Sequence, residues 1–437
     1  MATVVGIAVL VVGLLVSIGL HELGHMIPAK RFGVRVPRYM VGFGPTLWST
    51  TRGETEYGLK AIPLGGYVRL VGMLPPAHAV GAEDEKPRGV VGQMVAEARR
   101  ASAEEIPPGE DHRAFYRLST PKKLVVMAGG TLINLVVGAL LLGGVLVTHG
   151  VAEATTTVGM VGRCVLPADE PQDRECTADD PPSPADEAGV EVGDVLVEFD
   201  GRPITEWSDF QAAVRGSEGV GIPLVVERDG ERLTLLVNPV ETERPVFGED
   251  NRVVEEDGEV VTEVIRYVGI SPTTGRRPVP VAEAVPLVGE LVWQTVQTIV
   301  RLPWQVADIG RAIVGAGERD PAGVVGLVGV AQVAGQVASV SELTVADRVA
   351  AMVSLVGSLN IALFVFNLVP LLPLDGGHVA GALWEGAKRQ WARLRGLPRP
   401  RPADMARMMP LAYGVFAVLI GLGLFLVIAD LVVPVTG

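Results

Sequence analysis

Three side chains suited to metal chemistry stand close together in the stretch HELGH, namely His21, Glu22 and His25. On a helix, residues i and i+4 share a face, so both imidazoles can reach one metal ion while Glu22 points at a water on that ion. A zinc ion with three protein ligands keeps a fourth position open for such a water and lowers its pKa to about 7. HELGH therefore predicts a catalytic metal site whose third ligand comes from elsewhere in the chain.

Two candidates for that third ligand lie in the segment FNLVPLLPLDGGHVAG, at Asp375 and His378. Pro370 and Pro373 prevent a regular helix before Asp375, and irregular backbone at membrane depth is tolerated where it lines a cavity. The remaining histidines fit less well, because they lie in polar loops or at the far end of an apolar run: His78, His112 and His149. Asp375 and His378 are therefore both open as the third ligand.

The elements that must hold these residues are membrane helices. The chain has 437 residues, of which 48% are hydrophobic, and a formal charge of -13, so it is too apolar for an ordinary soluble protein and too charged to lie wholly in lipid. Four uncharged runs approach or exceed the roughly 20 residues that span a bilayer. They are Thr3 to Leu20, Leu124 to Gly150, Val349 to Leu374 and Met408 to Ala429. The first has no basic region before it, so we expect a span rather than a cleaved signal peptide.

The distribution of charge predicts the orientation. Residues 149 to 347 hold 14 Lys and Arg against 35 Asp and Glu, whereas seven basic residues lie between Lys388 and Arg407. Basic residues also follow the first span and precede the second. By the positive-inside rule, 29 to 123 and 375 to 407 are cytoplasmic, 149 to 347 is extracytoplasmic, and both termini face out.

The acidic region contains a segment with a soluble pattern, Ser183 to Val214. Its "DVLVEFDG" alternates as a strand into a turn, and "TEWSDFQAAV" begins a helix. The segment resembles a PDZ domain of the bacterial protease type over roughly 155 to 240. Such domains bind extended peptides at a sheet edge, which we place near Thr156 to Gly162; a purely steric role in limiting access is the alternative.

Between this domain and the third span, 241 to 280 reads as a linker with a strand or two, including "RYVGISP", and 281 to 340 as amphipathic helices. Pro321 to Ser339 is uncharged but weakly hydrophobic, so we expect a helix on the outer membrane face, with a fifth span as the alternative. The only two cysteines, Cys164 and Cys176, lie on the predicted outer side. They permit one disulfide, although two free thiols are also compatible with the sequence.

HELGH in the first span, "NLVPLLPLDGG" in a later one and a PDZ domain between them resemble the site-2 protease family of intramembrane zinc metalloproteases, in its actinobacterial single-PDZ branch. The stretches "VGFGP", "IPLGGYV" and "GGTLINLVVG" also follow the family pattern. The resemblance does not extend over about 75 to 112 and 241 to 262. One departure is Leu372, where many relatives have the second proline that stands here at Pro373.

This resemblance implies roles for five residues. His21, His25 and Asp375 would bind one catalytic Zn²⁺, Glu22 would be the general base, and Asn367 would hold the substrate backbone. "GLKAIPLGGYVRL", Gly58 to Leu70, alternates enough to be an edge strand that holds an unwound substrate, or an ordinary hairpin that packs on the first helix. Asn134 either bonds the catalytic region or simply joins two helices.

The predicted fold is a polytopic α-helical membrane protein with an extracytoplasmic α/β PDZ domain and a cytoplasmic membrane-associated β-hairpin region. Its segments are transmembrane helix 1–28, cytoplasmic loop 29–123, transmembrane helix 124–150, PDZ domain 155–240, linker and amphipathic helices 241–347, transmembrane helix 349–374, cytoplasmic loop 375–407 and transmembrane helix 408–430.

The expected function is zinc-dependent cleavage of membrane spans in single-span proteins such as anti-sigma factors, after an upstream site-1-type protease has trimmed them, in a stress response. No nucleic-acid partner is expected. The competing hypotheses are a non-catalytic PDZ scaffold with a structural zinc and a metal transporter. The base Glu22 argues against the first of these, because structural zinc sites have no use for it, and the small number of intramembrane ligands argues against the second.

Overall fold

Four helices in the computed structural model are long and apolar enough to cross a membrane. They are α1 (Ala2–Arg31), α4 (Thr120–Thr148), α9 (Val345–Asn367) and the run Met405–Val432, which joins the 3-10 helix η3 (Met405–Met408) to α11 (Met409–Val432). They correspond to the four predicted spans, so the prediction of a polytopic membrane protein is confirmed. As predicted, α1 continues without a break through HELGH.

The structure describes residues 2–167, 174–177, 180–246, 255–256, 259–316, 319–320, 323–341 and 343–434. They form two units: the membrane unit, made of Met1–His149 and Val279–Gly437, and the inserted unit, Gly150–Pro278. Each unit has its own buried apolar core.

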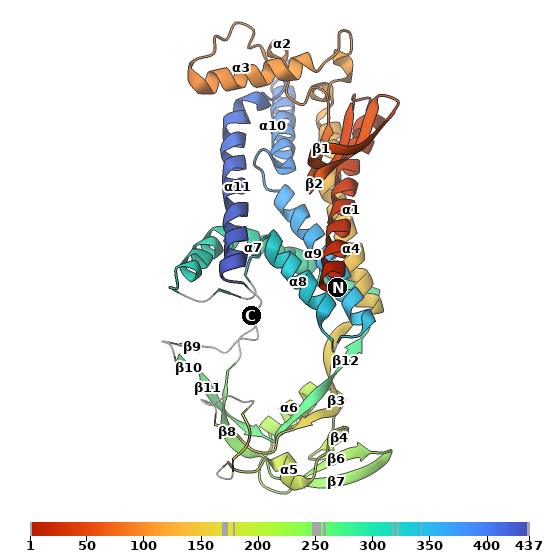
Figure 1. The fold of residues 1–437 in the computed structure, drawn as a ribbon, viewed down its shortest axis with the longest axis vertical. Coiled ribbons are helices and arrows are strands. Elements are labelled where there is room, and N and C mark those ends of the chain that lie inside the picture. Colours follow the sequence, from red (N-terminus) through yellow and green to blue (C-terminus); the bar gives the residue numbers. More distant parts are fainter. Residues whose placement is uncertain are drawn as a thin grey trace. The chain divides into compact units, whose positions relative to one another are not determined.

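Small residues allow the membrane helices to approach closely. A side chain at Gly24 of α1 would collide with the backbone of Gly129 in α4 at 2.4 Å, and one at Gly138 would collide with Ile361 of α9 at 2.7 Å. Glycine is thus required where these helices touch, as is typical of helix packing in membranes. Figure 1 shows α1, α4 and α9 side by side, with α11 standing apart from them.

A β-hairpin follows α1 and packs on it. Its strands are β1 (Arg38–Arg52) and β2 (Thr55–Arg69), and Tyr39 donates a hydrogen bond of 2.7 Å to the Gly19 carbonyl of α1. The predicted segment Gly58 to Leu70 lies in β2 except for its last residue. In the middle of the two strands, five large apolar side chains are exposed: Phe43, Leu47, Trp48, Leu59 and Ile62.

Two predicted loops contain more structure than the sequence indicated. The third membrane helix ends at Asn367 rather than Leu374, and 375 to 407 contains α10 (Asp375–Leu394). The stretch between β2 and α4 contains α2 (Ala77–Val80), α3 (Gly89–Glu104), η1 (Asp111–Arg113) and η2 (Phe115–Arg117). Buried Arg99 of α3 pairs with Asp404, just before η3. This ion pair links two segments that are distant in the sequence.

The inserted unit is a six-stranded antiparallel sheet with two short helices. The strands are β3 (Val151–Val161), β4 (Val195–Phe199), β5 (Arg202–Pro203), β6 (Ile222–Arg228), β7 (Glu231–Val237) and β12 (Ile270–Arg277), in the order β12-β3-β4-β6-β7 with β5 beside β4. Helices α5 (Pro184–Ala188) and α6 (Trp207–Arg215) complete the unit, and Cys164 and Cys176 form a disulfide.

The stretch 241 to 280 contains strands, as expected around "RYVGISP", but one of them belongs to the main sheet. Strand β12 lies at one edge of that sheet, while β8 (Val240–Pro245) pairs with β11 (Thr262–Tyr267) and β9 (Glu255–Glu256) with β10 (Glu259–Val260). The predicted groove at Thr156 to Gly162 does not lie at a sheet edge, because β3 pairs with β12 at Val158, Met160 and Val161 and with β4 at Thr157. The edge strands of this sheet are β12 and β7.

Two further helices return the chain to the membrane unit, α7 (Val281–Ile313) and α8 (Leu327–Ser339). Helix α8 has 13 residues, fewer than a membrane span needs. It packs against α1, where Ala334 of α8 and Leu10 of α1 share a buried cluster with Met352 of α9.

Candidate metal centre

Helix α1 presents both histidines of HELGH toward α4. His25 is buried, and its Nδ1 lies 2.8 Å from the carbonyl oxygen of Val126. A proton on Nδ1 donated to this carbonyl leaves Nε2 with its lone pair free for a metal. The neighbouring glycines make this contact possible, since a side chain at Gly130 would come within 2.2 Å of His25 Nε2.

Helix α10 brings Asp375 to the two histidines. The helix begins at Asp375, and the loop before it folds back over the first turn. A side chain at Gly376 would come within 2.3 Å of the Val369 carbonyl, and one at Gly377 within 2.6 Å of the Leu372 amide. The two glycines of the LDGG sequence therefore allow the close loop that orients the Asp375 carboxylate.

Three atoms from these residues form a nearly equilateral triangle. Nε2 of His21, Nε2 of His25 and Oδ2 of Asp375 lie 3.2 Å from one another in each pair. Ligand atoms about 2.0–2.1 Å from a tetrahedral zinc ion are about 3.3–3.4 Å apart. The three residues therefore fit one zinc ion with a fourth position left open.

The buried carboxylate oxygen supports this fit. Oδ2 of Asp375 is inaccessible to solvent and accepts no hydrogen bond of good geometry within the described part of the chain. Buried acceptors are normally satisfied, so an orphan needs an explanation. A metal ion held between this oxygen and the two imidazoles would supply one.

Glu22 lies beside the triangle and is itself buried. The backbone amide of Val68 in β2 interacts with its carboxylate. Strand β2 can approach so closely because Gly66 has no side chain; one built there would meet Ile18 at 2.9 Å and the Glu22 stem at 3.2 Å. The hairpin thus packs directly against the candidate base.

Asn134 of α4 also belongs to this cluster. Its side chain is buried, with Nδ2 placed 3.1 Å from Nδ1 of His21 and Oδ1 left without a partner. From the sequence, a contact with the catalytic region and a simple bond between helices were both open. A polar residue in a membrane helix was the available signal, but which residue it faces depends on how α4 packs on α1.

The two remaining sequence candidates are not members of the triangle. Asn367 is the last residue of α9 and is half-buried. His378, the rival third ligand, lies one turn into α10 and lines a small cavity with Lys123 and Glu385. Burial lowers the pKa of His378 to about 4, so its ring is neutral at pH 7. Among the described residues, the group able to hold a metal is His21, His25 and Asp375.

Comparison with known proteins agrees with this chemistry. The chain matches Peptidase family M50 over residues 9–397. It is 33% identical to the zinc metalloprotease Rip1 of Mycobacterium tuberculosis over 445 aligned positions, which cover 100% of this chain and 99% of that protein. The metalloprotease MmpA of Caulobacter vibrioides is 27% identical, over 88% of this chain and 89% of that protein.

The membrane helices, the triangle of ligand atoms and the buried glutamate define a zinc metalloprotease of the membrane. Zinc is accordingly the cofactor. The chain belongs to peptidase family M50, the site-2 protease family.

Proposed function

We propose that this chain cleaves peptide bonds within the membrane spans of single-span proteins, with zinc held by His21, His25 and Asp375. The observation that carries the proposal is the 3.2 Å triangle of ligand atoms with buried Glu22 beside it. A structural zinc site would fill its fourth position with protein and would have no use for that carboxylate.

Glu22 is the general base in this proposal. Bound zinc supplies Lewis acidity toward the scissile carbonyl and acidifies a water. Glu22 accepts the proton of the attacking water and passes it to the leaving amine. Its burial keeps bulk water away from the carboxylate, and the contact with Val68 holds it in place.

Asn134 positions His21 in the same scheme. When Nε2 of His21 is a ligand, the proton of the neutral ring is on Nδ1, which then needs an acceptor. Rotating the Asn134 amide by half a turn exchanges its nitrogen and oxygen, which are interchangeable in shape. The orphaned Oδ1 then accepts from His21, so one rearrangement satisfies both groups.

The hairpin is proposed to present the substrate. A membrane helix must be unwound before its backbone can be cut, and a strand offers replacement hydrogen bonds. Strand β2 is suited to this role because it passes Glu22 at Gly66, and because its exposed apolar side chains Leu59 and Ile62 can enter the lipid. Asn367 would align the extended chain from the other side of the site.

The inserted unit is proposed to be a PDZ domain that restricts entry to trimmed substrates. A hollow of about 560 Å³ lies between α6 and the residues around Tyr267, close to the start of β12. A peptide end in this hollow could extend along the open edge of β12. In this scheme the unit is extracytoplasmic, both termini face out, and the metal centre is near the cytoplasmic side. The proposed substrates are anti-sigma-factor-like proteins whose outer domain has first been shortened by an upstream site-1-type protease.

Reconstitution tests the proposal. The full chain, loaded with zinc in liposomes, is incubated with a single-span substrate that carries a short or a long outer domain, and fragments are identified by mass spectrometry. We expect a cut inside the span, faster for the short substrate, and none with Glu22→Gln at equal zinc content. Equal cleavage by Glu22→Gln would refute the base role, and absence of cleavage by both would favour the scaffold hypothesis.

A further inference from the structure

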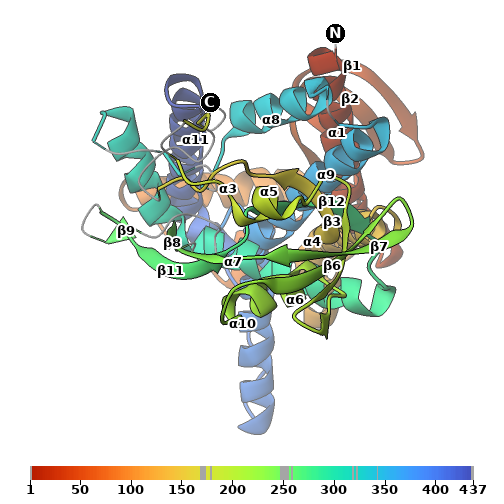
Figure 2. The ribbon, with the colours of Figure 1, turned by 90° about the horizontal axis from the view of Figure 1, so that it is seen from below.

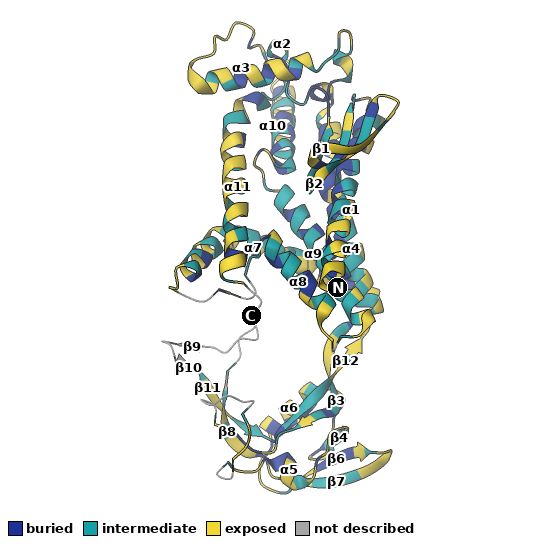
Figure 3. Cartoon of the chain, viewed as in Figure 1, coloured by how far each residue is buried: buried dark blue, intermediate teal, exposed yellow. Residues whose placement is uncertain are grey.

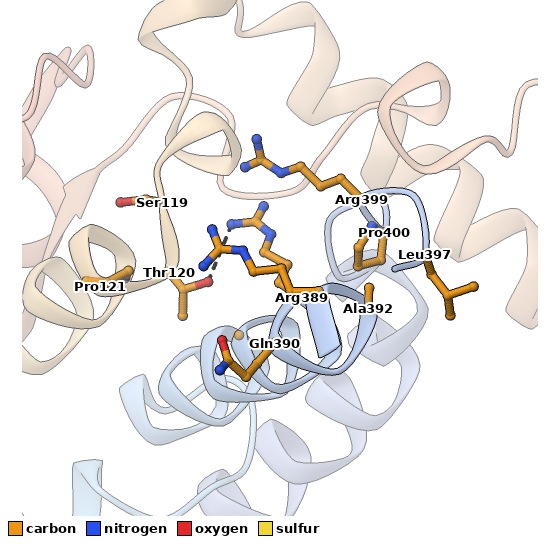
Figure 4. A pocket seen from close by; sticks show the side chains of 11 residues that line it. Ser119, Thr120, Pro121, Arg389, Gln390, Ala392, Leu397, Arg399 and Pro400 are labelled. Atoms are coloured by element: carbon orange, nitrogen blue, oxygen red, sulfur yellow. Dashed lines mark hydrogen bonds between the residues drawn. The ribbon is translucent and has the colours of Figure 1, made fainter. Parts of the chain in front are cut away.

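A second polar site lies in the membrane unit, where the start of α4 meets α10. A hollow of about 540 Å³ is lined there by Ser119 and Thr120 and by three arginines, Arg389, Arg393 and Arg399. Figure 4 shows Arg389 and Arg399 beside the hollow, with the hydrogen bond of 3.4 Å that Arg389 donates to Thr120. None of these residues takes part in the metal centre.

The hollow has excess positive charge. The carboxylate of Glu385 forms ion pairs with Lys123 at 2.8 Å and with Arg389 at 2.5 Å. The side chains of Lys123 and Arg389 are only 7% and 16% exposed, so Glu385 is already neutralised by buried or nearly buried partners. Arg393 and Arg399 are exposed, and no carboxylate in the described part of the chain pairs with either of them. Their two charges are therefore available to an anion.

The start of α4 adds to this potential. The 29-residue helix begins at the hollow, so the positive end of its dipole faces that hollow. Ser119 occupies the capping position, but its side chain makes no capping hydrogen bond. Pro121 in the first turn has no N–H, and the Thr120 hydroxyl accepts Arg389 at 3.4 Å, so the helix start contributes its dipole and the Ser119 hydroxyl. A helix start that faces several guanidinium groups favours a phosphate group.

The neighbouring face of α10 favours a lipid headgroup as the phosphate group that would bind here. Leu383, Trp384, Trp391 and Leu394 recur at helical spacing and are all exposed, between 55% and 74% of their full accessibility. Lys388 lies over the Trp384 ring and Arg395 over the Trp391 ring. Tryptophan with flanking basic residues is characteristic of the boundary between lipid headgroups and acyl chains. In Figure 2, α10 extends beyond the other helices of the unit, so this stripe has room for lipid.

We propose that the hollow binds the phosphate group of an anionic phospholipid, with Arg393 and Arg399 as its principal ligands. The headgroup phosphate would lie against the arginines and the start of α4, and the acyl chains would follow the apolar stripe past Leu397, which lines the hollow. Basic pockets between membrane helices recognise anionic lipids in this way. This proposal is independent of the proposed protease function, since no residue of the metal centre contributes to it.

Native mass spectrometry of the full chain tests the site. Dioleoylphosphatidylglycerol is titrated onto the detergent-purified protein, with dioleoylphosphatidylcholine as the neutral reference. The test variant is Arg393→Gln/Arg399→Gln. The matched control is Arg31→Gln/Arg100→Gln, which removes the same charge from exposed positions of the membrane unit that lie outside both the hollow and the apolar stripe of α10. Zinc content and the size-exclusion profile verify that each variant is folded.

We expect the wild type to bind phosphatidylglycerol in preference to phosphatidylcholine, with affinity at least about tenfold lower in the test variant and nearly unchanged in the control. Equal affinity in all three proteins, or equal losses in both variants, would overturn the site. Inorganic phosphate is titrated separately. If it binds with the same arginine dependence while the lipid does not, the phosphate site stands but the lipid source is wrong; if neither binds, the proposal fails.

Discussion

Two carboxylates of the membrane unit, those of Asp430 and Asp375, differ in how their buried oxygens are bonded. Asp430, near the end of α11, has both oxygens hydrogen-bonded: Oδ1 accepts Arg319 at 2.7 Å, and Oδ2 accepts the Gly329 amide at 2.7 Å. Asp375, at the start of α10, leaves its buried Oδ2 without a good donor and aims it at two imidazoles. One group is closed and the other is open.

The two aspartates therefore have different roles: Asp430 holds two helices together, whereas Asp375 is placed to bind a ligand. Asp430 joins α11 to the start of α8, and most of the length of α11 between its ends is exposed (Figure 3). Both oxygens of Asp430 are used, so this carboxylate has no acceptor left for a ligand. Asp375 keeps one buried oxygen without a donor. The orphaned oxygen gains meaning from its position, because it faces two imidazole nitrogens that can share a metal ion with it.

The largest effect is expected at Glu22, which lies beside Asp375 at the metal centre. Glu22→Gln keeps the shape of the side chain but cannot accept the proton. We expect cleavage to fall about 10²–10⁴-fold, the usual contribution of a general base. Single-turnover cleavage assays on zinc-loaded protein measure it. Bound zinc equal to that of the wild type is the control, because the amide leaves all three proposed ligands in place.

Exchanging the two aspartates for asparagine breaks the comparison directly. Asp430→Asn leaves Arg319 buried without a counter-charge, so we expect a loss of about 3–5 kcal/mol in stability with zinc retained. Asp375→Asn should lose zinc while the metal-free protein unfolds at nearly the same temperature. Thermal unfolding in detergent and zinc analysis measure both. The reverse pattern would show that the open and closed assignments are wrong.

Asn134 tests whether the open cluster includes a supporting residue. We expect Asn134→Ala to weaken zinc binding about 10–100-fold, because removing the partner of a ligating histidine usually has this effect. Competition with a chelator measures the affinity. Asn360→Ala is the matched control, since Asn360 is equally buried but bonds to Ser17, away from the triangle. Equal zinc affinity in both variants would leave Asn134 as a simple bond between helices.

A smaller effect is expected at a third carboxylate, in the inserted unit. Burial raises the pKa of Asp194, but hydrogen bonds from Arg228 and the Glu191 amide outweigh it and hold the pKa below the usual value. Since the folded-state pKa is the lower one, the contribution is present above about pH 4 and is lost as the pH falls further.

Hydrogen exchange of the full chain at pH 3 to 6, read on peptides from β4 and β6, measures this loss. Asp194→Asn should remove part of the acid sensitivity of the inserted unit, because the variant has no carboxyl group to protonate at this position. The metal centre residues are unaffected by this substitution. An unchanged pH dependence in the variant would show that other carboxylates dominate.

Much of the architecture could be predicted from local patterns. Hydropathy predicted the four spans, and the spacing of His21 and His25 placed two ligand candidates on one face of a helix. The resemblance to a known family added Asp375. The helical content of 375 to 407 was missed, because its apolar residues are interleaved with charges and Gly376 and Gly377 read as a loop.

The sequence by itself determined what depends on neighbours along the chain: which segments are apolar enough for lipid, and that HELGH lies on one helix. Only the tertiary structure decided what depends on distant segments. It set Asp375 rather than His378 beside the histidines, turned Asn134 toward His21, and paired β12 with β3. Helix phase and strand pairing are fixed by packing against remote surfaces, and a single sequence does not encode that geometry locally.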